Sequence, residues 1–456
     1  SPMMIPGVII VIAFVQLYGE SGIVTKALEL IFHLEEAPYQ LSGLPGILFV
    51  ITYTQYVYFY LNVSVGLKYL DYSAVEAARS LGAGKLRVFC DTVLPTILPA
   101  IITSSIMTFA SGIGAFTAPN LIGNGYKVLS TQIVRSKANY RMDIASVQVM
   151  ILFAMSISVM LLLQYYKKKY SYTRSIRPSP FRVTSKKNSL FQIACGMIVF
   201  VQLAFILVPI AGIIYLSFNT THSIMTTIFP TEFTLENYLD IFRSDRVFQP
   251  LLNSLTMSLI AVFAGLLLTV PTSYLAYHHK KDKILSSIKY LTMIPWCMPA
   301  SVIAINLINA FNVKNFFAFG EALIGGYAIL PIGYTITALP LLLSSNDVAM
   351  ESFNPALEEA SSSLGASKWH GIWHVVLPNI APGIASGAIL VFIRTIGEYT
   401  ISALLYGVHN RPISISMITN MQEFHVGISM SYGVIVIAIS YLALALIFKL
   451  DKRQQI

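Results

Sequence analysis

Charged side chains are scarce in this sequence of 456 residues. Asp, Glu, Lys and Arg make up 11% of it, whereas soluble domains carry about 25% charged residues. Hydrophobic residues reach 55%, and the mean hydropathy is +0.68. This balance excludes an ordinary soluble enzyme and a disordered chain, and it predicts bundles of membrane-spanning helices.

Sequence patterns for catalysis or metal binding are also missing. The three cysteines, Cys90, Cys195 and Cys297, show no spacing for a metal site or a disulfide framework. No HExxH motif and no nucleophile elbow occurs, and the segment from Gly82 to Lys85 has neither the spacing nor the Ser/Thr of a P-loop. We therefore expect no catalytic residue, no metal and no cofactor in this chain, and any ATP hydrolysis would require a partner.

Ten stretches are long and apolar enough to cross a hydrocarbon core of about 30 Å. They predict an all-α polytopic membrane protein built from two homologous helical bundles. The predicted spans cover residues 3–18, 44–67, 93–115, 142–166, 190–217, 251–278, 287–311, 322–345, 376–398 and 428–449.

Basic residues concentrate in one loop, which indicates the orientation of the spans. Segment 167–187 holds eight Lys and Arg residues and no acidic residue, so the positive-inside rule places it in the cytoplasm. Such a tract could bind nucleic acid or anionic lipid, and its position between two spans favours membrane lipid. We expect no nucleic-acid partner.

One segment of the chain occurs twice. Glu359, Gly365, Pro378 and Pro382 each follow a counterpart by 283 residues, and those counterparts are Glu76, Gly82, Pro95 and Pro99. Chance would not reproduce a charged, glycine-broken segment in register with two prolines. We therefore predict a first repeat at 1–166, a basic cytoplasmic linker at 167–189 and a second repeat at 190–456.

The second repeat has two opening spans, 190–217 and 251–278, that the first repeat lacks. Pro299 of the second repeat corresponds to Pro6 of the first. The comparison predicts that about 100 residues with two further spans precede Ser1, so that a complete chain would carry about twelve spans.

Each repeated segment lies between two spans on the predicted cytoplasmic side. It reads as a short helix, a glycine break at Gly82 or Gly365, a second short helix and a proline-marked entry into the next span. This order suits a docking element, with Trp369 and Trp373 as apolar anchors. The alternative is a cytoplasmic turn that lies on lipid headgroups.

Both segments resemble the EAA loop in the permease subunits of type I ATP-binding-cassette importers. Ser361, Thr92 and Val375 depart mildly from that pattern. The resemblance implies that each loop docks on one subunit of a homodimeric cytoplasmic ATPase, which holds ATP and Mg²⁺, and that an extracytoplasmic binding protein delivers the cargo at a bacterial inner membrane. The implied ATPase-coupling residues are Glu76, Ala77, Ala78, Gly82, Leu94, Pro95, Glu359, Ala360, Gly365, Leu377 and Pro378.

The stretch from Arg394 to Thr400, with Ala403–Gly407 and Arg411–Ser414, looks most like permeases for ferric iron. Permeases of the same class for thiamine, phosphonate or phosphosugar, and polyamine are the alternatives. A secondary transporter driven by an ion gradient would need buried acidic groups in several spans and no duplicated docking loop, so it fits the sequence less well.

Arg394, Glu398 and Tyr399 lie near the outer end of one predicted span. Arg394 and Glu398 are four residues apart, which places them on one helical face and predicts an ion pair. They could line or gate a translocation path, or they could form a structural pair. Ser111 and Ala115 occupy the equivalent positions in the first repeat, so any such path would be asymmetric.

Overall fold

A computed structural model describes residues 5–68, 70–170, 189–279, 281–314, 316–318 and 320–452. Helices dominate the described residues, whose only extended pairing is an isolated antiparallel bridge between Asn219 and Phe233. The predicted all-α class is confirmed. Most of the predicted linker, residues 171–188, lies outside the described residues, so its role stays a prediction.

Nine helical stretches of the described chain are long and apolar enough to span a membrane. A tenth candidate is a helix pair, Lys283–Cys297 and Ala300–Phe311, that bends by 112°. The single span expected at 287–311 is therefore broken. Pro295 and Pro299 lie at the break, where each lacks the N–H that would continue a straight helix. The nine stretches are Gly7–Phe32, Gly43–Lys68, Lys85–Ile113, Met142–Tyr166, Gln192–Ser217, Asp245–His278, Ile329–Ser352, Lys368–Ile396 and Val426–Ile447.

The segment before residue 171 forms nine α-helices among its described residues. In chain order these are α1 (Gly7–Tyr18), α2 (Ile23–Phe32), α3 (Gly43–Lys68), α4 (Tyr72–Ser80), α5 (Lys85–Val88), α6 (Leu94–Ile113), α7 (Thr117–Ile122), α8 (Leu129–Ala138) and α9 (Met142–Tyr170).

The segment after residue 188 begins with additional helices and then repeats the earlier order. Its described α-helices are α10 (Ser189–Ser217), α11 (Thr221–Thr226), α12 (Glu236–Arg243), α13 (Asp245–His278), α14 (Lys283–Met293), α15 (Ala300–Phe311), α16 (Ile329–Ser352), α17 (Ala356–Ser363), α18 (Lys368–Gly371), α19 (Leu377–Ile396), α20 (Thr400–Leu405), α21 (Ile413–Gln422) and α22 (Val426–Lys452).

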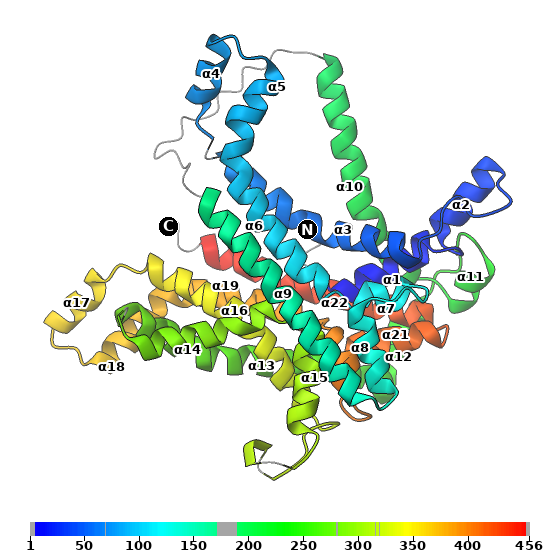
Figure 1. The fold of residues 1–456 in the computed structure, drawn as a ribbon. Helices are drawn as coiled ribbons and strands as arrows, with labels where there is room; N and C mark the ends of the chain where they lie inside the picture. The colour runs from blue at the N-terminus through cyan, green and yellow to red at the C-terminus, as the bar shows by residue number, and fades with distance from the viewer. Residues whose placement is uncertain are drawn as a thin grey trace.

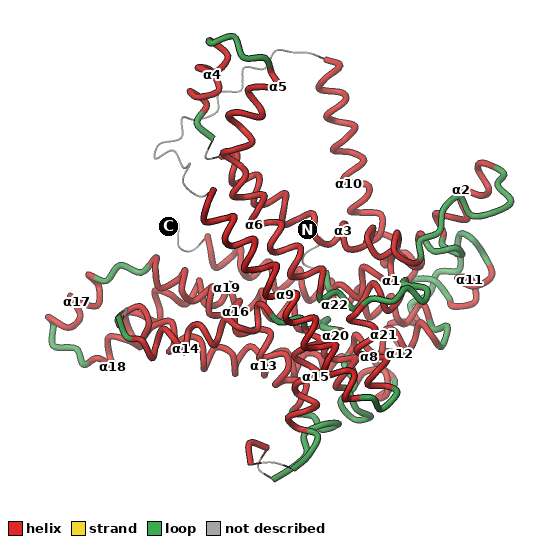
Figure 2. Tube along the Cα trace, in the orientation of Figure 1, coloured by secondary structure: helices red, strands yellow, loops and turns green. Residues whose placement is uncertain are grey.

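The two arms of the molecule diverge from a common base. Helices α4 and α5 lie at the end of one arm, and α17 and α18 lie at the end of the other (Figure 1). The short helices α7, α8, α12 and α21 gather where the arms meet, and the trace between these regions is almost entirely helical (Figure 2). The repeated segments are thus far apart, while the opposite ends of the two arms are in contact.

Small residues allow close helix packing at equivalent places in both arms. A Cβ on Gly66 of α3 would lie 3.1 Å from the Cβ of Ala100 in α6, and a Cβ on Gly383 of α19 would lie 2.6 Å from that of Ala349 in α16. The glycine and the alanine have exchanged places, since 349 and 383 follow 66 and 100 by 283 residues. Each arm therefore keeps one small pair where two helices approach.

Candidate functional site

The first repeated segment, residues 71–95, is here called the first coupling loop. Asp71 caps α4 by accepting a hydrogen bond from the Ser73 N–H. The helix ends at Ser80, and Gly82, which follows the C-cap residue, has φ +83°. The N–H groups of Gly82 and Ala83 donate to the carbonyls of Arg79 and Ala78 over 2.9 and 3.1 Å. This is a Schellman ending, in which a glycine adopts the left-handed conformation at no steric cost.

The second coupling loop, residues 354–378, repeats this turn. Gly365 has φ +85°, and the N–H groups of Gly365 and Ala366 donate to the carbonyls of Ser362 and Ser361 over 3.0 and 3.2 Å. The predicted glycine breaks at Gly82 and Gly365 therefore both have a positive φ. An L-residue with a side chain is strained in this conformation.

Apolar side chains project from the tips of both loops. Leu81 and Leu364, at equivalent positions, are each 89% exposed. Leu86 is 80% exposed and its counterpart Trp369 is 70% exposed. Side chains of this kind at a protruding tip mark an interaction surface. The two glutamates of the predicted coupling set, with Ala77, Ala360, Pro95 and Pro378, are also exposed, whereas Ala78, Leu94 and Leu377 are half-buried.

A π-helical stretch, which the sequence did not lead us to expect, joins each loop to the span that follows. The stretches are Phe89–Val93 and Ile372–Val376, and the N–H of Leu94 and of Leu377 donates to the carbonyl five residues back. Pro95 and Pro378 come directly afterwards, and a proline ring clashes with the carbonyl four residues before it in a regular helix. The widened turn relieves that clash, and the prolines were its sequence signal.

The second coupling loop is tied to a neighbouring span through a carboxylate. The Tyr274 hydroxyl of α13 donates to the Glu358 Oε1 atom over 2.9 Å, and His278 Nε2 lies 3.2 Å from Glu358 Oε2. Val75 occupies the position equivalent to Glu358 in the first loop. The second loop is therefore anchored by a carboxylate where the first has an apolar side chain.

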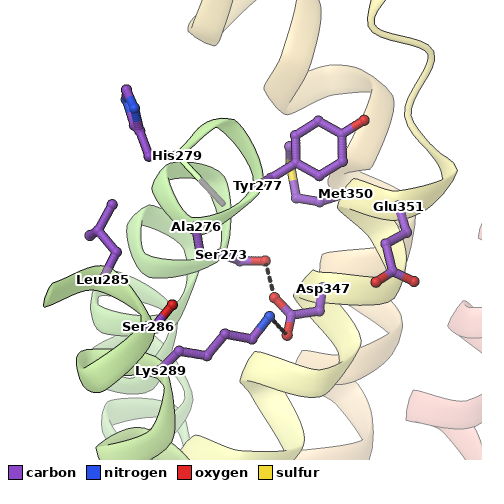
Figure 3. A pocket seen from close by; sticks show the side chains of 10 residues that line it. All are labelled: Ser273, Ala276, Tyr277, His279, Leu285, Ser286, Lys289, Asp347, Met350 and Glu351. Carbon is purple, nitrogen blue, oxygen red and sulfur yellow. Dashed lines mark hydrogen bonds and ion pairs between the residues drawn. The ribbon is translucent and has the colours of Figure 1, made fainter. Parts of the chain in front are cut away.

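A cavity of about 370 Å³ lies beside this anchor, between the ends of α13, α14 and α16. Asp347 lines the cavity from α16, where it accepts a hydrogen bond from Ser273 over 2.7 Å and pairs with Lys289 over 2.6 Å (Figure 3). Met350 and Glu351 lie on the α16 side (Figure 3). The opposite charges of Lys289 and Asp347 neutralise each other, and the ion pair links α14 to α16.

The opposite ends of the two arms meet through an aromatic pair, Phe116 and Tyr399, here called the central stack. Their ring centroids lie 5.6 Å apart with an interplanar angle of 20°, and the Asn120 amide donates to the Tyr399 hydroxyl over 2.9 Å. Phe116 and Tyr399 are separated by 283 residues. Equivalent positions of the two repeats therefore touch each other, as they would about a twofold axis.

Reciprocal glycine–proline contacts surround the central stack. A Cβ on Gly114 would lie 2.9 Å from the Pro299 Cβ, and one on Gly397 would lie 2.1 Å from the Pro6 Cβ. Each glycine ends a span of one repeat, and each proline caps a helix of the other. The backbones of the two repeats thus approach each other closely at this end.

A lysine adds a polar contact between the arms. Lys137 of α8 donates to the carbonyl of Leu404 in α20, where a cation complements the negative end of the helix. Burial lowers the pKa of Lys137, because desolvation penalises the charged form.

The predicted ion pair between Arg394 and Glu398 is wrong. The helix ends at Ile396, so the two residues do not share a helical face. Glu398 instead accepts hydrogen bonds from the Ile401 N–H at 2.9 and 3.1 Å and from the Ser402 N–H at 3.1 Å, which caps α20. Arg394 is exposed and makes no ion pair among the described residues.

Comparison with known proteins identifies the family. The model of the binding-protein-dependent transport system inner membrane component matches residues 2–172 and 270–456, two stretches that each contain one coupling loop. The chain belongs to this family. It is therefore a multi-pass inner-membrane permease of the ATP-binding-cassette class.

Three relatives illustrate the similarity. A Sinorhizobium fredii protein named "Probable ABC transporter permease protein y4fN" is 30% identical over 96% of this chain and 78% of its own length. The ferric transport system permease protein of Actinobacillus pleuropneumoniae is 23% identical over 96% of this chain, which spans 63% of that relative. The sulfate transport system permease protein CysT of Escherichia coli is 25% identical over 35% of this chain and 61% of its own length.

Proposed function

We propose that this permease imports its cargo by coupling two cytoplasmic ATPase subunits to the helices through its two coupling loops. The observation that carries this proposal is the matched geometry of the loops. Both have the same Schellman turn, the same π-helical joint and a leucine tip that is 89% exposed. A partner that closes as a dimer needs two such contact points at the ends of two movable arms.

The likeness of the two loops favours a homodimeric ATPase. One kind of receiving surface accepts both turns, because Leu81 and Leu364 project from equivalent backbone positions. ATP and Mg²⁺ bind in that partner, and the permease itself catalyses no reaction.

The arrangement of the arms supports a mechanism of alternating access. The coupling loops are far apart (Figure 1), while Phe116 and Tyr399 are stacked at the other end. Closure of the ATPase dimer draws the loops together and separates the central stack, so that cargo from an extracytoplasmic binding protein enters. The conformation described is then open toward the cytoplasm.

Ferric iron is the proposed cargo, because a ferric permease is similar along 96% of this chain and the segment from Arg394 to Ser414 resembles ferric permeases. Thiamine, phosphonate or phosphosugar, and polyamine are the alternatives within the class. Secondary transport is disfavoured, since a transporter driven by an ion gradient would not require the two docking loops.

The test is uptake into proteoliposomes that contain the full-length permease, its ATPase and its binding protein. Labelled ferric iron, thiamine and an organophosphonate are supplied with and without ATP. We expect ATP-dependent accumulation of ferric iron. Uptake of a different probe would reject iron and keep the importer class, and uptake that ignores ATP would reject the class of mechanism.

A further inference from the structure

The outer end of the first repeat carries a helix ending of the same kind as the coupling loops. Helix α8 is followed by a turn in which the N–H groups of Tyr140 and Arg141 donate to the carbonyls of Lys137 and Ser136, each over 2.9 Å. This is the Schellman pattern of hydrogen bonds.

The second repeat has an equivalent turn after α21. Helices α8 and α21 both have ten residues and correspond with an offset of 284, because the connection from α20 to α21 is one residue longer than that from α7 to α8. The N–H groups of Phe424 and His425 donate to the carbonyls of Met421 and Asn420 over 3.2 and 2.7 Å. The two outer turns therefore share one backbone geometry.

Both outer turns hold an aromatic residue in the left-handed conformation. Tyr140 has φ +58° and Phe424 has φ +63°, whereas Gly82 and Gly365 take this place in the coupling loops. A bulky side chain is strained there, and such strain is found most often at functional sites. Its presence at equivalent positions of both repeats points to a use for the two rings.

The two rings project into water. Tyr140 is 94% exposed and Phe424 is 62% exposed. A ring that anchored the protein in lipid would need neither polar neighbours nor a left-handed turn, whereas exposed aromatic side chains with a polar rim are typical of contacts between proteins. The residues on both sides of each ring are polar and exposed, namely Asn139 and Arg141 in the first repeat and Glu423 and His425 in the second.

Both turns lie at the end of the molecule opposite to the coupling loops. Helix α8 follows α6 and leads into α9, and α21 follows α19 and leads into α22. The coupling loops lie at the other ends of α6 and α19, so the two turns belong to the outer side. Both helices are found where the two arms meet (Figure 1). One partner that spans both turns would therefore bridge the two repeats.

The charges beside the two rings differ. Arg135 of α8 is exposed and makes no ion pair among the described residues, and its counterpart in α21 is Thr419. Asn139 corresponds to Glu423. The first turn is thus more basic than the second, and it fits the more acidic part of a partner.

We propose that Tyr140 and Phe424 are the two contact points at which the extracytoplasmic binding protein docks, with an acidic surface of that protein against the first repeat. This inference rests on the proposed function and assigns the surface that it requires. Two equivalent rings match a partner that touches both repeats at once. The unequal charges favour one of its two possible orientations.

The test is the affinity of the full-length permease for its purified binding protein. The permease is assembled with its ATPase in lipid nanodiscs, without ATP. Tyr140→Ala and Phe424→Ala should each weaken binding about tenfold, as expected for an aromatic anchor of an interface. The matched control is Phe229→Ala, which truncates a 52% exposed ring in another outer loop and should leave the affinity unchanged.

Glycine variants separate docking from folding. Tyr140→Gly and Phe424→Gly relieve the strain of the left-handed position. Thermal stability in nanodiscs should therefore stay the same or rise, while the affinity falls about tenfold. Lower stability with unchanged affinity would mean that the rings serve the fold or the lipid contact, and it would overturn the proposal.

An exchange of charges tests the orientation. Arg135→Thr combined with Asn139→Glu gives the first turn the residues of the second, and it should slow association about tenfold at low salt and much less at high salt. Arg243→Thr, which removes an exposed arginine of α12, is the control and should not slow it. An unchanged association rate would overturn the acidic contact. Uptake that ignores ATP, with docking intact, would reject only the proposed function.

Discussion

The two repeats share their coupling loops but differ in how their spans are covered. In the apolar window of α16, 56% of the residues are buried. In the window of α3, the equivalent helix of the first repeat, 28% are buried. The stretch Lys368–Ile396 is 28% buried and Lys85–Ile113 is 11% buried. In the second repeat α13 packs against both α16 and α19. The described part of the first repeat has no helix in the place that α13 takes beside α16 and α19.

This comparison separates two kinds of constraint. The loops keep the same backbone turn and the same exposed leucine although their flanking side chains differ. The spans keep their lengths and their small-residue contacts but differ in their polar side chains. Gln55 of the first repeat corresponds to Ala338 of the second, and Ser111 corresponds to Arg394. A homodimeric ATPase, as proposed above, would require the first pattern, whereas it places no such demand on the spans.

The largest expected effect is on the coupling glycines. Gly82→Val and Gly365→Val should each lower ATP-driven uptake at least about tenfold, because a β-branched residue in the left-handed region costs about 1–3 kcal/mol and distorts the docking turn. The measurement is uptake in proteoliposomes together with the yield of inserted permease. The spans should insert normally, since the strain falls outside them.

The first loop supplies a matched control for this experiment. Gly84 has φ −65°, and its counterpart is Ser367, so Gly84→Ser should preserve uptake. If both valine variants transport at the normal rate, the loops do not transmit ATPase closure. If only one variant fails, the two loops are not equivalent, and the argument for a homodimeric ATPase weakens.

A smaller effect is expected where the arms meet. Gly397→Ala should destabilise the permease by about 1–3 kcal/mol, because its Cβ has no room beside Pro6, and Gly114→Ala should cost less. Thermal unfolding in lipid nanodiscs ranks the variants. Gly112→Ala is the control, since nothing lies within 4 Å of a Cβ there and alanine favours a helix. Equal stability of the three alanine variants would mean that the glycine–proline contacts between the repeats can accommodate a Cβ atom.

Local pattern predicted the loops well and the contacts between elements poorly. The spacing from Glu76 to Pro95 was sufficient to place a helix, a glycine turn and a span entry. The ion pair failed because four-residue spacing implies a shared face only within a helix, and Gly397 interrupts α19 before Glu398. That glycine was the overlooked signal.

The central stack shows what a repeat can and cannot reveal. No local property of Phe116 or Tyr399 indicates that the two rings touch across 283 residues. The constant offset does make them equivalent, and equivalent residues near a twofold axis meet. Which equivalent pair lies on the axis depends on the packing of all the spans, which sequence periodicity does not encode.

The smallest expected effect concerns the Glu358 anchor of the second loop. Glu358→Gln removes the charge that pairs with His278 and weakens the bond from Tyr274, at a cost of about 1–2 kcal/mol. Hydrogen exchange in α17 should therefore accelerate roughly tenfold, while exchange in α4 stays unchanged. The matched control is Glu359→Gln, which alters the neighbouring exposed carboxylate. If α17 exchanges no faster than before, the anchor does not hold the second loop. The two loops would then be equally mobile, despite the difference between Glu358 and Val75.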